Sequence, residues 1–402
     1  MKSTKKKLKK RYNLILIIAC SLFLLFIVFL LFYFSRRTNT LNVNNIIVEP
    51  REKIVVNYDF ESEVFFNDKL GENIFSQEII KSIDEAQESV EVAVYSMNHP
   101  EIKEALIRAI DRGVRIDVLL CEKGKPTHDN FFADIDQYIN RKDIKFSSSS
   151  LSLVSESYLM HHKFMIIDRN LDKRVLFFGS YNFTYLQEKY DPSFVLKTYD
   201  PSFVKIFGEE FDRINFGLHG KEKKLQNINP FAARIEYTNG FVEIWFSPGT
   251  KSVNLKSRMS ELIKSTKERI RMMIWLWTDK SLAKDILNLD SEIKISIITD
   301  EININHENSI FKDLLKLGVE DNIEIITDEK RQFEIQELRD DILNSFLHHH
   351  ALIIDDKILI TGTSNWSTSG FFNNDESMIV SDVYPLVESF IDSFKTNYLI
   401  NK

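Results

Sequence analysis

Two periodic patterns of apolar and polar residues follow one another along the chain, and their order occurs twice. Strict alternation or a short apolar run predicts a strand, and apolar residues three or four positions apart predict a helix. In the first half the expected strands are 64–66, 90–96 and 114–120, and the expected helices are 79–89, 101–111 and 203–214. The second half repeats this order with strands at 242–246, 270–277 and 293–299 and helices at 258–267 and 386–398. Strands that alternate with helices in two copies predict two α/β lobes.

The limits of the two copies divide the chain into domains. We expect a first repeat over residues 58–216, a connector over 217–231 and a second repeat over 232–402. Each lobe should contain a central mixed β-sheet flanked by helices, and a pseudo-twofold axis should relate the lobes. The connector is weakly patterned, and its charged run Lys221–Lys224 is typical of a solvated segment.

The segment before the repeats predicts a membrane anchor. Leu14–Phe34 is uncharged and apolar except for Ser21, and as a helix it would be about 32 Å long, which matches a bilayer core of roughly 30 Å. Lys and Arg are concentrated before this run, and only Arg36 and Arg37 follow it closely. The positive-inside rule therefore predicts a cytoplasmic N-terminus, a single span within residues 1–37 and a catalytic region on the outer, periplasmic or extracellular side.

Two other interpretations of this segment are open. A cleaved secretory signal is disfavoured, because the apolar run is longer than a signal core and no small-x-small cleavage site ends it. Ile17–Cys20 loosely resembles a lipoprotein processing site, but cleavage there would leave a mostly apolar stretch near the new terminus. Residues 38–57 are rich in Asn and weakly patterned, so we expect a stalk between the anchor and the first repeat.

Charge and cysteine content narrow the choice of partners. The whole chain has a net charge of −7, but residues 1–37 hold nine basic and no acidic residues. The remainder has 43 basic and 59 acidic residues, which is a net charge of −16. Such a charge repels polyanions at long range and counts against general nucleic-acid binding. Cys121 is the one cysteine beyond the anchor, which excludes an intramolecular disulfide there.

A polar signature occurs once in each copy. The first signature consists of His161-His162-Lys163, four apolar residues, Asp168 and then Gly179-Ser180-Tyr181-Asn182-Phe183-Thr184. The second consists of His348-His349-His350, four apolar residues, Asp355, then Gly362-Thr363-Ser364-Asn365-Trp366-Ser367 and Asn374-Asp375-Glu376. Five of the nine histidines lie in these two clusters, a concentration that packing alone would not produce.

The spacing within each signature suits phosphoryl transfer. Residues two apart on a strand share a face, so His161 and Lys163 should project together, and so should His348 and His350. Two imidazoles from related lobes can divide the chemistry, since one can attack phosphorus while the other protonates the leaving oxygen. Lys163 and the asparagine amides of both signatures are suited to holding phosphate oxygens.

Both signatures resemble those of the phospholipase D superfamily, in which H-x-K-x-x-x-x-D is followed by G-S-x-N. The resemblance covers about residues 60–400. The strings 179–184 and 362–367 are more similar to those of bacterial nucleases and cardiolipin hydrolases than to those of cardiolipin synthases. The resemblance implies a covalent phosphohistidine intermediate, no cofactor and no metal requirement.

By position, the resemblance also implies roles for individual residues. The catalytic residues would be His161, Lys163, His348 and Glu376. His161 would be the nucleophile, His348 would be the general acid and then the base toward water, and Glu376 would orient a catalytic histidine through its ring N–H. The phosphate-binding side chains would be those of Ser180, Asn182, His350, Thr363 and Asn365. The motif aspartates, Asp168 and Asp355, would have a structural role.

Two positions depart from the family pattern. Lys163 has no lysine counterpart, because His350 stands there. The position that matches Glu376 in the first copy is Ser193, with Asp191 nearby. His350 can donate a hydrogen bond to phosphate, and a neighbouring anion would favour its charged form, but it is not a fixed cation.

Two further patterns have simpler explanations. The run His348–His350 suggests a metal site, but only two of its three side chains share a face, which is too few for a closed site. The apolar and aromatic run Met272–Trp277 is better explained as a buried strand than as a substrate contact.

The leading hypothesis is a phosphodiesterase that hydrolyses membrane phospholipid at the outer membrane face. An anchor would concentrate the enzyme near its substrate, so long-range electrostatic steering would be unnecessary. Three alternatives remain open: an endonuclease acting on DNA or RNA, a transphosphatidylase of the cardiolipin-synthase type, and a degenerate protein that binds without turnover.

Overall fold

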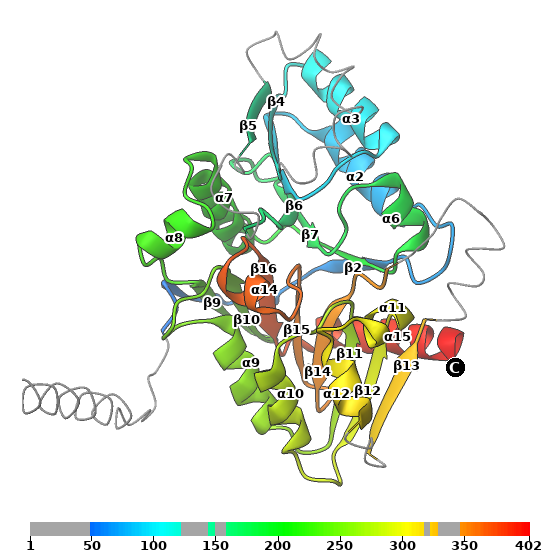
Figure 1. Cartoon of the computed structure of the whole chain (residues 1–402). Helices are drawn as coiled ribbons and strands as arrows, with labels where there is room; N and C mark the ends of the chain where they lie inside the picture. The colour runs from blue at the N-terminus through cyan, green and yellow to red at the C-terminus, as the bar shows by residue number, and fades with distance from the viewer. Residues whose placement is uncertain (1–48, 122–143, 149–157, 317–321, 329–345) are drawn as a thin grey trace, which may run out of the picture. The chain divides into compact units, whose positions relative to one another are not determined.

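A computed structural model describes residues 49–121, 144–148, 158–316, 322–328 and 346–402 of the chain (Figure 1). The chain divides into two compact units, Met1–Val48 and Glu49–Lys402, and the second contains both repeats. The predicted anchor, within residues 1–37, lies outside the described residues. Among the residues that are described, no helix has the length and apolar character needed to cross a membrane.

Two mixed β-sheets form the framework of the second unit. The first sheet has the order β2-β8-β7-β6-β3-β4-β5. Its strands are β2 Glu63–Phe66, β3 Ser89–Val94, β4 Arg115–Leu120, β5 Ile144–Ser148, β6 Lys163–Ile167, β7 Val175–Gly179 and β8 Phe194–Thr198. The second sheet has the order β1-β9-β10-β16-β15-β14-β11-β12-β13. Its strands are β1 Glu52–Val55, β9 Phe231–Tyr237, β10 Gly240–Phe246, β11 Arg269–Ile274, β12 Lys294–Thr299, β13 Ile323–Thr327, β14 His350–Ile354, β15 Ile358–Gly362 and β16 Ser377–Ser381.

The two sheets repeat one topology. From β10 to β13 the second sheet has the same succession of strands as the whole first sheet, and β9 and β1 extend it at one edge. In both copies the motif strand lies antiparallel to its neighbour, β6 beside β3 and β14 beside β11. The α/β fold with two similar lobes, predicted from the alternating pattern, is therefore present.

Helices cover the sheets and join them. They are α2 Ile74–Glu85, α3 Pro100–Asp111, α6 Tyr185–Tyr190, α7 Pro201–Asn215, α8 Lys221–Leu225, α9 Leu255–Lys264, α10 Lys280–Leu287, α11 Glu301–Asn305, α12 Ile310–Lys316, α14 Thr368–Phe372 and α15 Tyr384–Asn401. Helix α2 packs beside α3, and α9 packs beside α10, at opposite ends of the view in Figure 1. Helix α7 contacts β6 and β7 of its own lobe and β9 of the other, whereas α15 contacts β14, β15 and β2.

The largest apolar cluster is shared by the two lobes. It contains Phe164 and Phe207 of the first lobe together with Phe246 and Phe390 of the second. The ring of Phe207 lies 5.2 Å from that of Phe246, edge to face. Burial of so many aromatic side chains across the boundary makes the lobes one packed body and fixes the signatures relative to each other.

One expectation about the domains was wrong. Residues 52–55, at the end of the segment expected to be a stalk, form β1 and pair in parallel with β9. The Cα partners run from Glu52 opposite Ala233 to Val55 opposite Glu236. The strand has four residues, too few for a pattern in the sequence to reveal it, and the backbone bonds to β9 supply its partners.

The motif aspartates fasten the first helix of each lobe to the sheet. The carboxylate of Asp168 accepts the backbone N–H groups of Gln87, Glu88 and Ser89 at 2.9, 2.7 and 3.0 Å. Asp355 accepts those of Lys267, Glu268 and Arg269 at 2.9, 2.7 and 3.0 Å. Burial opposes these three donors, but they lower the pKa of Asp355. Both aspartates have positive φ, 51° and 53°, a conformation that Asp and Asn tolerate.

We expect Asp168→Asn to lower the free energy of unfolding by about 1–3 kcal/mol, because an amide cannot accept three backbone donors as a buried carboxylate does. Asn keeps the left-handed backbone accessible, so the loss reports the hydrogen bonds. Urea unfolding followed by circular dichroism measures the change, with the exposed Asp172→Asn as the matched control. Equal unfolding midpoints for the two variants would contradict this role of Asp168.

Candidate active site

The two signatures meet between the lobes at equivalent ends of their strands. Lys163 begins β6 and pairs with Val94 of β3. His350 begins β14 and pairs with Ile274 of β11, which is the same place in the second copy. The preceding histidine of each signature, His161 or His348, projects beside it into the boundary between the lobes.

Each of these two histidines bonds a carboxylate of the opposite lobe. The Nδ1 atom of His161 lies 2.7 Å from Oε2 of Glu376. The Nδ1 atom of His348 lies 3.2 Å from Oδ2 of Asp191. The pairing is reciprocal, because each lobe supplies one imidazole and the carboxylate for the other. In each pair Nδ1–H donates to the carboxylate, so Nε2 is left for chemistry.

Glu376 is itself held by the residues around it. Its Oε2 accepts the hydroxyl of Thr363 at 2.6 Å, and its Oε1 accepts the amide of Asn374 at 3.0 Å. The Glu376 side chain is fully buried. Burial lowers the pKa of His161, and the attraction of Glu376 offsets part of that effect. His161 is therefore a neutral imidazole with a fixed tautomer at neutral pH.

Asp191 is a site residue that the sequence did not assign. It stands two positions before Ser193, the residue that matches Glu376, and the family pattern gives it no role. Its Oδ1 accepts the backbone N–H of Phe346 at 3.0 Å, so it also holds the segment that carries His348. The hydroxyl of Ser193 is occupied elsewhere, since it accepts the Gln187 amide at 2.8 Å.

Two hydroxyls expected to bind phosphate have partners inside the protein. The hydroxyl oxygen of Ser180 accepts the backbone N–H of Phe194 at 3.1 Å. The hydroxyl of Thr363 donates to Glu376 and accepts the N–H of Ser377 at 3.0 Å. Both residues are fully buried. These contacts make each hydroxyl a support for the strand ends that frame the site.

Lys163 is the cation beside His161. Its Nζ donates to the backbone carbonyl of His161 at 3.0 Å, and the side chain is 1% exposed. Burial lowers the pKa of Lys163 to about 7, although Glu376 attracts the charged form. The ammonium therefore loses its proton far more readily than an ordinary lysine.

His350 is buried at the position that mirrors Lys163. Neither of its ring nitrogens has a hydrogen-bond partner among the residues that the structure describes. Burial lowers its pKa well below the usual value, and the neighbouring His348, His161 and Lys163 add to that effect. A buried imidazole with two open nitrogens can donate a hydrogen bond to an anion that enters the site.

The asparagine of each signature has a buried side-chain oxygen that is open. The side-chain oxygens of Asn182 and Asn365 are buried without a hydrogen-bond partner. An amide oxygen accepts, so each of these two could take a donor that the described residues do not supply. Their N–H groups are suited to phosphate oxygens.

An aromatic ring flanks His161 and another flanks His348. Tyr95 follows β3 and lies 5.2 Å from the His161 ring, and Trp275 follows β11 and lies 5.3 Å from the His348 ring. Both aromatic side chains are half-buried. The interpretation of Met272–Trp277 as a buried strand thus needs a correction, because Trp277 is fully buried but Trp275 lines the site. Strand β11 ends at Ile274, so the pattern of buried strand residues does not apply to Trp275.

Comparison with known families decides the family. The family described as "Cardiolipin synthase, PLD-like domain" matches residues 79–215 and 259–398, more than half of the chain. The chain belongs to the phospholipase D superfamily. It carries two phospholipase D-like phosphodiesterase lobes, and members of this superfamily act on phosphodiester bonds.

Individual relatives of this superfamily match parts of the chain. Mitochondrial cardiolipin hydrolase of Mus musculus is 34% identical over 59 residues, which are 15% of this chain and 27% of that protein. The human protein of the same name is 32% identical over 59 residues, 15% of this chain and 23% of that protein. The chain therefore spans about a quarter of the length of the curated relatives it matches.

Solved structures extend the likeness of fold to nearly the whole described chain. Phosphatidylserine synthase of Haemophilus influenzae Rd KW20 aligns with a TM-score of 0.59 at 12% identity and covers 85% of this chain and 87% of that one. Polyphosphate kinase of Porphyromonas gingivalis aligns with a TM-score of 0.52 at 12% identity, covering 84% of this chain and 50% of that one. At such identities the likeness shows the shared fold alone.

We expect Asp191→Asn to lower kcat on a phosphodiester by about 10²-fold, because His348 would lose the carboxylate that fixes the tautomer and orientation of its ring. The measurement is turnover of bis(p-nitrophenyl) phosphate, with Asp172→Asn as a control for an exposed aspartate. A kcat equal to that of the control would show that the His348–Asp191 contact does not serve catalysis.

Proposed function

We propose that the protein hydrolyses phospholipid phosphodiester bonds through a phosphohistidine on His161. The observation that carries this proposal is the reciprocal pairing of two imidazoles with carboxylates of opposite lobes, His161 with Glu376 and His348 with Asp191. One site thus contains a nucleophile and a proton donor on two separate imidazoles.

The surroundings of the two histidines favour different roles. His161 is neutral, its Nδ1 is bonded to a fully buried carboxylate, and its Nε2 lone pair suits attack on phosphorus. The side chains of His348 and Asp191 are each 15% exposed, so this pair can exchange protons with water. This difference supports His161 as nucleophile and His348 as acid and base.

The reaction then follows in two steps. Nε2 of His161 attacks phosphorus and forms an N–P bond, while the bond from phosphorus to the leaving oxygen breaks and that oxygen takes the Nε2 proton of His348. Neutral His348 next removes a proton from water, the water oxygen bonds phosphorus, and the N–P bond breaks. A phosphate monoester is released and His348 has regained its proton.

Four side chains are placed to hold the phosphate during these steps. Lys163 and His350 begin their strands beside the two histidines, and the amides of Asn182 and Asn365 would add N–H groups from the second part of each signature. A bound phosphate anion would favour the charged forms of Lys163 and His350. These donors would stabilise the charge that develops on the equatorial oxygens.

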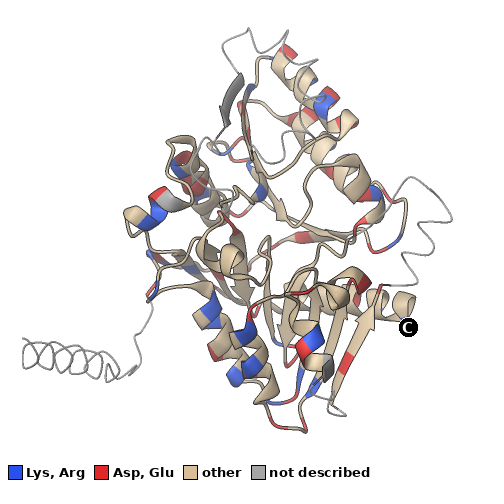
Figure 2. Ribbon diagram, viewed as in Figure 1, with Lys and Arg blue, Asp and Glu red and all other residues tan. Residues whose placement is uncertain are grey.

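Charge favours a lipid over a nucleic acid as substrate. Basic residues gather on α9 and α10, coloured blue in Figure 2, and those of α9 face carboxylates. Nitrogen–oxygen distances are 2.7 Å for Lys256–Asp279, 2.9 Å for Arg258–Glu243 and 3.1 Å for Lys264–Asp285. Together with the charge of −16 beyond the anchor, from 43 basic and 59 acidic residues, this pairing offers a polyanion little attraction.

We also propose that the predicted span within residues 1–37 holds the catalytic region at the outer face of the cell membrane. Membrane phospholipid would then reach the site by lateral encounter, which needs no attractive field. Part of the chain matches proteins named as cardiolipin hydrolases, and this similarity supports a lipid substrate.

The test uses the full-length chain in detergent with chelator present. It is incubated with phospholipid vesicles that contain cardiolipin and, separately, with single- and double-stranded DNA and RNA. We expect headgroup release that His161→Ala abolishes, and an acid-labile phosphoryl group on the wild type after rapid quenching. Cleaved nucleic acid with intact lipid would assign the protein to the nucleases, and transfer to an added alcohol without hydrolysis would make it a transphosphatidylase. Binding without any turnover would contradict an enzymatic function.

The pKa of Lys163, lowered by burial to about 7, predicts a pH dependence. Lys163 is charged below that pH and neutral above it, so kcat/KM should fall as pH rises through about 7 in the free enzyme. Lys163→Arg keeps its charge at all these pH values, so the alkaline fall should move upward or disappear. Initial rates from pH 5 to 9, with ~0.5-unit steps, measure both profiles. An unchanged alkaline limb in Lys163→Arg would contradict the assignment.

A further inference from the structure

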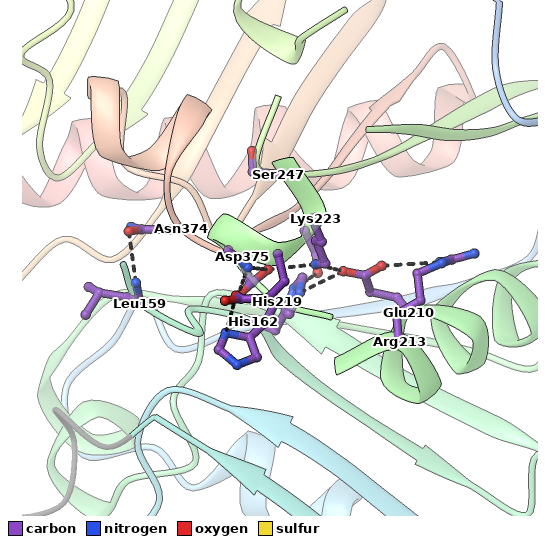
Figure 3. A network of polar contacts seen from close by, with 12 residues as sticks. Leu159, His162, Glu210, Arg213, His219, Lys223, Ser247, Asn374 and Asp375 are labelled. Carbon is purple, nitrogen blue, oxygen red and sulfur yellow. Dashed lines mark hydrogen bonds and ion pairs between the residues drawn. The ribbon is translucent and has the colours of Figure 1, made fainter. Parts of the chain in front are cut away.

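A buried network of charges joins the connector to both lobes (Figure 3). We call His162, Glu210, Lys223 and Asp375 the inter-lobe charge network. The Nζ atom of Lys223, on α8, bonds the carboxylate of Glu210 on α7 and lies 2.7 Å from Oδ1 of Asp375. Lys223 is 4% exposed, so the expectation of a solvated connector was wrong for this residue. Its two buried carboxylate partners are the physical reason.

Asp375 links this network to the nucleophile. Its carboxylate accepts the backbone N–H of Gly220 at 2.9 Å and the ammonium of Lys223. Its backbone carbonyl accepts the N–H of His161 at 2.9 Å, and its N–H donates to Leu159 at 2.8 Å. The residue that immediately follows it is Glu376. Asp375 therefore helps to fix the position of the His161 backbone. It also helps to fix the position of Glu376, whose carboxylate holds the His161 ring.

A second connection fastens the other side of Glu376. Nδ1 of His162 lies 2.5 Å from the hydroxyl of Ser377, and Nε2 of His162 lies 3.3 Å from Oε1 of Glu210. Residues 375 and 377, which flank Glu376, thus both lead to Glu210, one through Lys223 and one through His162. Removal of Lys223 would open this ring on the side of Asp375.

The network resembles a metal site but already contains a cation. Ligand atoms of His162, Glu210 and Asp375 lie within 4.8 Å of one another, close enough to share an ion. The ammonium of Lys223 bonds both carboxylates and takes that place. Burial lowers the pKa of Lys223, but Asp375 and Glu210 outweigh burial and raise it above the usual value. Lys223 is therefore charged at neutral pH and neutralises part of the buried acid.

The corresponding histidine of the second copy has a different environment. Nε2 of His349 lies 3.2 Å from Asp68, and that same carboxylate oxygen accepts the amide of Asn397 at 2.7 Å. In the second copy the amide of Asn397 bonds the carboxylate beside His349, whereas in the first copy the ammonium of Lys223 bonds the carboxylate beside His162.

We propose that Lys223 is a positioning residue for the nucleophile: the connector lysine holds Asp375, and through it the His161–Glu376 pair, in the geometry needed for attack on phosphorus. The proposal rests on the proposed phosphodiesterase activity. It concerns the rate of the chemical step, because Lys223 touches neither the reacting atoms nor the phosphate-binding side chains.

The experiment compares Lys223→Met with wild type in the full-length chain on bis(p-nitrophenyl) phosphate. Met keeps the length of the side chain and removes its charge. We expect kcat to fall by about 10- to 100-fold with KM changed by less than about threefold. In a Glu376→Gln background, Lys223→Met should lower kcat by no more than about threefold further, since both changes act on the same pair. Multiplying losses in the double variant would overturn the proposal.

Two further variants separate positioning from stability. Lys197→Met removes another buried lysine, 3.0 Å from Glu78, and should lower the melting temperature with kcat within about twofold of wild type. If Lys223→Met does not fold, the triple variant Lys223→Met, Glu210→Gln, Asp375→Asn removes the unpaired charges. The triple variant should fold and retain a kcat about 10- to 100-fold below wild type. A wild-type kcat in it would refute the role of Lys223.

A readout without turnover distinguishes this proposal from the proposed function. Selective ¹⁵N-histidine labelling should show a low-field Nδ1–H signal of His161 bonded to Glu376, assigned by its absence in His161→Ala. We expect Lys223→Met to weaken or shift this signal and Lys197→Met to leave it unchanged. If wild type cleaves no diester, the proposed function fails, and the signal still decides whether Lys223 positions His161.

Discussion

The candidate site depends on one constraint, which is that the His161 and His348 imidazoles must each find a carboxylate in the opposite lobe. The hydrogen bond from His161 to Glu376 spans 2.7 Å and joins residues 215 positions apart in the chain. A hydrogen bond needs a donor–acceptor distance of about 2.7–3.2 Å and a nearly straight angle, so this contact restricts how the lobes dock. The shared aromatic cluster under α7 and α15 supplies attraction without direction. The polar contacts between the lobes are directional, so they determine the relative placement of the lobes that apolar packing leaves open.

Burial limits how much fixed charge this arrangement can hold. Lys163 already has its pKa lowered to about 7 because it is out of contact with water. A second lysine at position 350 would add a cation beside Lys163 and both catalytic histidines in a region of low dielectric. A neutral imidazole at His350 avoids that repulsion before substrate binds and can still donate to a phosphate. The departure from the family pattern is thus compatible with the chemistry that the rest of the site supports.

Local patterns predicted the parts of the structure that depend on local sequence. The repeated strands and helices follow from periodicity, and Glu376 follows from its spacing after the second signature. Asp191 could not be found in this way, because the matching position holds Ser193 and the contact with His348 depends on how two distant segments pass each other. Lys223 was equally hidden, since its partners Glu210 and Asp375 lie 13 and 152 positions away. The charged run 221–224 does not show which of its side chains will be buried, because the carboxylates that contact Lys223 come from distant segments.

The different surroundings of His161 and His348 meet a requirement of the proposed phosphoryl transfer. Phosphoryl transfer through a histidine needs one neutral and one protonated imidazole at the same moment, and a symmetric site would give neither residue a preference. His161 is enclosed by a fully buried carboxylate that Thr363 and Asn374 also bond, which fixes one tautomer. His348 faces a carboxylate that remains partly open to water. The two lobes keep one topology, while the few positions around each imidazole differ, and under the proposed mechanism those differences would divide one reaction between the two halves.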